Sequence, residues 1–144
     1  MATLKISDLS VGDWVRYDDR ICQIAEIYHL TYNLGSKKMT SFPRVTLFYE
    51  DDMPTYHESA ILNDIHPIPI TAEILEKNGF ERSTSQFIVY HTDKVWISHD
   101  EPSETWSVTV YINDVTSNLH ANILHIHQLQ HTLRLAGVDK EINL

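Results

Sequence analysis

The sequence predicts an α+β protein built from antiparallel strands and two helices. Short apolar runs separated by turn residues fill the first 68 positions, a pattern typical of antiparallel sheets. From Trp106 to Ile112, apolar and polar residues alternate with the period of a strand that has one wet side. The last part of the chain repeats apolar residues at three- and four-residue spacing, which is typical of an amphipathic helix.

Residues 1–68 are expected to form a small antiparallel SH3-like β-barrel or curled sheet. Gly12-Asp13 marks a turn before the first strand, and Asp18-Asp19 leads into the second. The stretch 31–43 contains Gly, Ser and Asn and is expected to be a loop or a long hairpin tip. The predicted strands of this lobe are 14–17, 21–28, a third at Val45, Leu47 and Tyr49, and 55–61, followed by an extended, proline-containing connector at 65–70.

Residues 69–144 are expected to follow the order α-β-β-β-α. Thr71 has the position of a helix N-cap and Asn78-Gly79 that of a helix end, which predicts a short helix over 71–79. A three-stranded antiparallel meander over 86–90, 94–98 and 106–112 then leads to a final helix over 119–136, closed by Gly137. The two lobes form either two domains or one compact domain.

Composition narrows the classes of protein that fit. The 144 residues have a formal charge of −9, and this acidity argues against binding to a nucleic-acid backbone. The single cysteine, Cys22, excludes an intramolecular disulfide and a cysteine-based zinc site, and a buried inert thiol is expected. We find no signal-peptide pattern and no apolar run of membrane-spanning length, so we expect a cytoplasmic protein without membrane partners.

No motif assigns a reaction, and we therefore favour a non-enzymatic protein over an enzyme. A G-x-S-x-G elbow is absent, and so is a phosphate-binding glycine loop, because each glycine stands alone. The sequence indicates no catalytic residue and no cofactor.

His127 and His131 are the candidate metal ligands. Because they lie four residues apart on the predicted last helix, their imidazoles are expected to converge on one ion, with His120 on nearly the same side. The spacing is that of an HExxH metalloprotease, but Gln128 stands where the catalytic Glu would be, and an amide is no general base. The other interpretation is a solvated or partner-facing polar stripe without metal.

One local group combines basic and aromatic side chains and is the candidate recognition surface. A barrel loop carrying such residues can hold a single-stranded nucleic acid by stacking, which the surrounding negative field opposes. Its members are Tyr28, Tyr32, Lys37, Lys38 and Arg44.

Two parts of the sequence resemble a known family. The first joins the segment 9–15, Leu-Ser-Val-Gly-Asp-Trp-Val, to the segment 67–80, and the second joins 126–131 to 137–141. In order and spacing these segments are similar to an uncharacterised family of short proteins from Bacteroides-type bacteria and their prophages or mobile elements. The resemblance implies a bacterial cytoplasmic protein, of phage origin in some members, and it implies no activity.

These observations favour a protein-interaction module of bacterial or phage origin, whose partner is another protein or a second copy of itself. Two alternatives remain open. The acidic surface would suit a nucleic-acid mimic that inhibits a DNA-binding protein, and the histidine pair would suit a metal-binding protein or a metal-assisted enzyme.

Overall fold

The computed structural model describes residues 4–34, 38–49, 57–112 and 115–144. It confirms an α+β protein in which antiparallel sheets dominate and helices are few. The chain forms two compact units, Met1–Ile68 and Pro69–Leu144. None of the helices in the described ranges combines the length and the apolar character that crossing a membrane requires.

Unit 1 is a five-stranded antiparallel sheet with the strand order β4-β3-β2-β1-β5. Its core is the buried face of this sheet, where Val15, Cys22 and Val45 are fully enclosed. The expected burial of the Cys22 thiol is confirmed. The elements are η1 (Ile6–Asp8), β1 (Trp14–Tyr17), β2 (Arg20–Leu34), β3 (Lys38–Phe48), β4 (His57–Ile61), η2 (Leu62–Asp64) and β5 (Ile65–Pro67).

The turn between β1 and β2 follows from its sequence. Tyr17 pairs with Arg20, which leaves Asp18 and Asp19 as a two-residue connection, and both have positive φ angles of 48° and 59°. Two positive φ values define the type I′ turn that matches the twist of a hairpin, and Asp tolerates this conformation better than most residues. The predicted turn is therefore confirmed.

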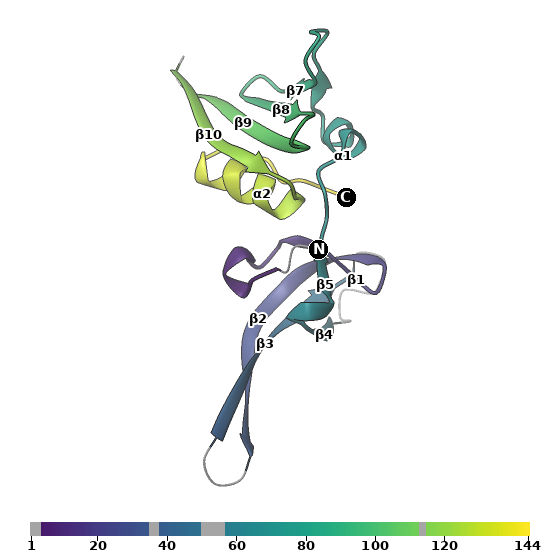
Figure 1. The fold of residues 1–144 in the computed structure, drawn as a ribbon, viewed down its shortest axis with the longest axis vertical. Helices are drawn as coiled ribbons and strands as arrows, with labels where there is room; N and C mark the ends of the chain where they lie inside the picture. The colour runs from purple at the N-terminus through teal and green to yellow at the C-terminus, as the bar shows by residue number, and fades with distance from the viewer. Residues whose placement is uncertain (1–3, 35–37, 50–56, 113–114) are drawn as a thin grey trace. The chain divides into compact units, whose positions relative to one another are not determined.

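Of the two alternatives predicted for 31–43, the loop is wrong for the described residues, whereas the hairpin is right, because this stretch is the far end of one long hairpin. In the described residues β2 continues to Leu34 and β3 starts at Lys38, in one antiparallel ladder that includes Thr31 with Ser41. Thr31, Tyr32, Thr40 and Phe42 favour extended backbone, and the pairing of the two strands with each other extends the ladder past the turn residues. Figure 1 shows the two strands running on as a ribbon beyond the shorter strands of the sheet.

The sheet of unit 1 is not a closed barrel. Its edge strands, β4 and β5, have no mutual pairing in the described residues, because β4 pairs with β3 and β5 pairs with β1.

Unit 2 contains a second antiparallel sheet, in the order β10-β9-β8-β7-β6, and two helices. The predicted three-stranded meander is thus a five-stranded one. Thr71 caps the first helix, since its Oγ1 accepts a hydrogen bond from the Ile74 N–H at 3.3 Å, as predicted. The elements are α1 (Ala72–Lys77), β6 (Glu81–Arg82), β7 (Val89–His91), β8 (Val95–Asp100), β9 (Thr105–Ile112), β10 (Val115–Ile123) and α2 (Ile126–Leu135).

The predicted helix over 119–136 is wrong in its first third. Residues 115–123 form β10, which pairs antiparallel with β9, and the helix starts at Ile126. Thr, Ser, Asn and His are frequent in 115–123 and are poor helix formers, and β9 offers this backbone partners in a ladder that has two register shifts. His120 therefore lies on a strand and not beside His127 and His131 on the helix.

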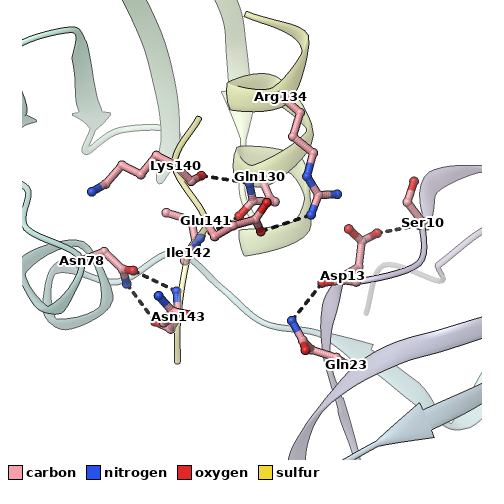
Figure 2. Close-up of polar contacts among 11 residues, drawn as sticks. Ser10, Asp13, Gln23, Asn78, Gln130, Arg134, Lys140, Glu141, Ile142 and Asn143 are labelled. Carbon is pink, nitrogen blue, oxygen red and sulfur yellow. Dashed lines mark hydrogen bonds and ion pairs between the residues drawn. The ribbon is translucent and has the colours of Figure 1, made fainter. Parts of the chain in front are cut away.

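The C-terminal segment is held against unit 2 by buried amides. Gln130 is 2% exposed; its Nε2 donates to the Lys140 carbonyl at 3.1 Å, and its Oε1 accepts from the Ile142 N–H at 2.7 Å (Figure 2). The same segment buries the Ile142 side chain. One polar side chain on α2 thus satisfies two backbone groups of an extended chain, which explains a Gln on the buried side of the helix.

Candidate functional site

His127 and His131 both lie on α2, as expected from their spacing, but in different environments. His127 is 2% exposed and His131 is half-buried, so the expected solvated polar stripe is wrong for His127. The His127 ring lies parallel to His125 with 5.7 Å between ring centroids and edge-on to His131 at 6.1 Å. The three rings form a continuous row along the start of the helix.

Gln128 has a structural role in this row. Its Oε1 accepts hydrogen bonds from the backbone N–H groups of Leu124 at 2.9 Å and His125 at 3.1 Å. His125 is the N-cap residue of α2 and Leu124 precedes it, so Gln128 bonds back to the two backbone groups at the entry to the helix. The residue at the position of a metalloprotease Glu thus caps α2.

The described residues contain no group of three or more His, Cys, Asp or Glu side chains arranged to hold a metal ion. A structural zinc site usually has four protein ligands and a catalytic one three. The row offers two imidazoles at four-residue spacing, and one of them, on His127, is enclosed by protein.

A hollow of about 430 Å³ in unit 2 has His99, Glu104 and His125 in its wall. Burial lowers the pKa of His125, and its hydrogen bond with Gln128 partly opposes this shift. The hydroxyl group of Ser103, also in the wall, donates to the carboxylate of Asp100. This serine is therefore bonded to an acid and not to a histidine base, so the arrangement differs from that of a nucleophilic hydrolase.

The candidate recognition surface lies on the ribbon of β2 and β3. Tyr28 pairs with Arg44 and Leu34 with Lys38, while Tyr32 is an even number of positions from Tyr28. Tyr28 and Arg44 are thus cross-strand neighbours, and the backbone of Tyr32 and Lys38 lies farther along the same ladder. The fifth candidate, at position 37, lies outside the described residues.

Sequence analysis missed an aromatic cluster on the outer face of the second sheet. Trp96 stacks on His91 with 5.2 Å between centroids and meets Tyr111 edge-on at 5.9 Å. Trp96 is 40% exposed and Tyr111 38% exposed, on the face opposite the buried residues of β8 and β9. The alternation within each strand assigns these residues to the wet face, but only the pairing of β7, β8 and β9 brings them together.

Tyr111 also lines a hollow of about 560 Å³ beside the turn at 92–94 and the segment 136–140. Trp and Tyr exposed together on a sheet are residue types enriched where proteins bind other molecules. Unit 2 therefore has a second exposed surface, formed by the side chains of His91, Trp96 and Tyr111, whose residue types are suited to binding.

Comparison with known proteins identifies no relative: no family model, no curated protein and no solved structure matches the chain.

Proposed function

We propose that this chain is a non-enzymatic protein-interaction module that acts in the bacterial cytoplasm, of bacterial or prophage origin, and that the ribbon of β2 and β3 is its main recognition element. The observation that carries the proposal is the length of this ribbon. β1 covers β2 only from Arg20 to Gln23, and β4 covers β3 only from Arg44 to Phe48. The ladder nevertheless continues to Leu34 and Lys38.

A ribbon that extends past its sheet contributes little to the core from which it projects. Two-stranded ribbons are marginally stable alone, so such an extension suits contact with a partner better than it suits packing. The residues from 27 to 49 include three Lys or Arg and no Asp or Glu, in a chain with a formal charge of −9. This local charge favours a protein partner with an acidic surface.

The proposed fold of unit 1 is an open variant of the SH3-like arrangement. Its support is the chain order, in which four consecutive strands form a meander, a 3-10 helix follows β4, and β5 returns to pair with β1. In small β-barrels, long loops and hairpins between strands are common positions for binding residues.

The experiment removes the ribbon and leaves the sheet. Tyr28 and Arg44 are cross-strand partners, so replacing residues 29–43 by Asn-Gly closes a two-residue hairpin between them. We expect the tagged wild-type protein to capture a specific protein from a bacterial lysate, and the shortened variant to lose it. Leu135→Ala, at an 88% exposed position on α2, is the control that keeps capture. Wild-type protein that captures nothing and scatters light as a monomer at all concentrations would refute the proposal.

A further inference from the structure

The outer edge of β2 is the part of the ribbon that carries this inference. As far as Ile24 this edge is paired, by β1 and by hydrogen bonds of Gly12 N–H to the Ile24 carbonyl at 2.7 Å and of Ile24 N–H to the Asp13 carbonyl at 3.0 Å. Beyond Glu26, the only strand paired with β2 among the described residues is β3, on the other side.

Pro43 reveals which backbone groups point out of the ribbon. Pro43 pairs with His29, and proline has no N–H to donate, so these two residues cannot exchange hydrogen bonds. They form the pair type without mutual hydrogen bonds, whose N–H and C=O groups point away from the partner strand. Because this direction alternates along a strand, the backbone groups of His29, Thr31 and Asn33 all point out of the β2 edge.

The two edges of the ribbon differ in how well they are protected against pairing with another strand. Proteins block sheet edges with proline, lysine or bulges. The β3 edge has Pro43 at one of its outward positions and Lys38 at its start. From Ile27 to Leu34 the β2 edge has no proline, no lysine and no acidic residue. In the part of the chain that the structure describes, no strand pairs with this edge, so its backbone groups can accept a further strand.

We propose that the outer edge of β2 binds an extended, acidic segment of a protein partner, which adds to the ribbon as a further strand. Strand addition obtains its affinity from backbone hydrogen bonds and its specificity from charge and from alternate side chains. The three cations between residues 27 and 49, without a carboxylate among them, complement an acidic strand. This inference rests on the proposed function and names the chemistry of its partner.

Two other occupants fit the charges less well. Pairing β2 with β2 of a second copy would join two ribbons that each have a net positive charge, which like charges oppose. A single-stranded nucleic acid would meet only three cations on a strongly acidic protein, and it cannot complete a backbone ladder.

The test uses the full chain and a labelled synthetic peptide in which Val and Glu alternate, with a Val-Lys peptide of equal length as the control ligand. We expect the Val-Glu peptide to bind more tightly than the Val-Lys peptide, by about tenfold or more, and to bind more weakly as salt is raised. Equal affinity for both peptides, or no binding of either, would overturn the inference.

Two matched proline variants test the edge. Thr31 and Ser41 are cross-strand partners of the same pair type as His29 and Pro43, so a proline at either position leaves the ladder between β2 and β3 intact. We expect Thr31→Pro to weaken binding of the Val-Glu peptide by about tenfold or more and Ser41→Pro to leave it within about twofold. Equal loss in both variants, or loss only in Ser41→Pro, would contradict binding at β2.

Amide hydrogen exchange of the wild-type protein gives an answer that does not depend on the folding of either variant. The peptide should slow exchange at His29, Thr31 and Asn33 and leave Met39 and Ser41, on the other edge, unchanged.

Two results would assign the edge to another occupant. Concentration-dependent dimers that Thr31→Pro abolishes would indicate a second copy of the chain, and tighter binding of an oligonucleotide than of the peptide would indicate a nucleic acid. If the shortened chain loses a captured protein but the peptide protects no amide, the proposed function stands and this inference fails.

Discussion

Asn78 and the backbone of Asn143 hold each other through two hydrogen bonds. The Nδ2 of Asn78 donates to the Asn143 carbonyl at 2.8 Å, and the Asn143 N–H donates to Oδ1 of Asn78 at 2.8 Å (Figure 2). A side-chain amide thus replaces the neighbouring strand that an extended segment would otherwise need. Together with Gln130 it ties the last residues of the chain to both helices of unit 2.

Asn78→Ala should release the C-terminal segment. The variant leaves two backbone groups of Asn143 without their present partner and removes a bond from Nδ2 to the Ile74 carbonyl, so we expect a loss of about 1–3 kcal/mol in the free energy of unfolding. Urea unfolding measures the loss, and carboxypeptidase should digest the C-terminus faster. Asn143→Ala is the control, because the bonds to Asn78 use only its backbone. Equal effects of the two substitutions would contradict this account.

Gln128→Ala should destabilise α2 by about 1 kcal/mol, the usual effect of losing an N-terminal cap. The N–H groups of Leu124 and His125 lose their acceptor in this variant. Gln128→Glu should retain stability, because a carboxylate accepts the same bonds and a negative charge is favourable at a helix N-terminus. Thermal unfolding followed by circular dichroism measures both; a Glu variant as unstable as the Ala variant would argue against capping.

Leu129→Ala should cost about 2–5 kcal/mol, since it opens a cavity beneath α2. Leu129 is fully buried, whereas Leu135 on the same helix is 88% exposed. Leu135→Ala should therefore change the free energy of unfolding by less than about 0.5 kcal/mol. Chemical denaturation of the pair tests the face of α2 that packs on the sheet, and similar costs would mean that the helix is rotated.

His125 should make the stability of unit 2 depend on pH. Its pKa in the folded chain is lowered from 6.5 by burial, so between the two pKa values the unfolded chain binds the proton more readily. The contribution of His125 is fully present above pH 6.5 and is lost as the pH falls from 6.5 through the folded pKa. The measurement is the difference in unfolding free energy between wild type and His125→Asn from pH 8 to pH 5. A difference that does not change with pH would show that the group titrates equally in both states.

Local signals predicted the parts of the fold that depend on neighbouring residues. Asp18-Asp19 forms the expected turn, Thr71 caps the expected helix, and β9 has the expected alternation. The predicted helix was wrong over 119–123, because the conformation of these residues is set by the pairing of β10 with β9. The length of the ribbon was underestimated for the same reason. Each of its two strands stays extended because it pairs with the other.

The arrangement of the candidate site residues was also predictable only where it depends on neighbours along the chain. The spacing of His127 and His131 correctly put them on one helix face, but it did not predict that His127 would be enclosed. Tyr28 lies near Arg44 because the two residues are paired across β2 and β3. Trp96 lies near His91 and Tyr111 because three strands pair side by side. These distances cannot be predicted from the spacing of the residues along the chain.

By itself, the sequence determined the α+β class, the turn at Asp18-Asp19, the cap at Thr71 and the apolar face of α2, because each depends on interactions within a few residues of the chain. Only the tertiary structure decided where α2 begins and that, among the described residues, no strand pairs with the outer edge of β2 beyond Glu26. Backbone hydrogen bonds between strands join residues far apart in sequence, so the partner strand, and not the local pattern, decides where each strand ends.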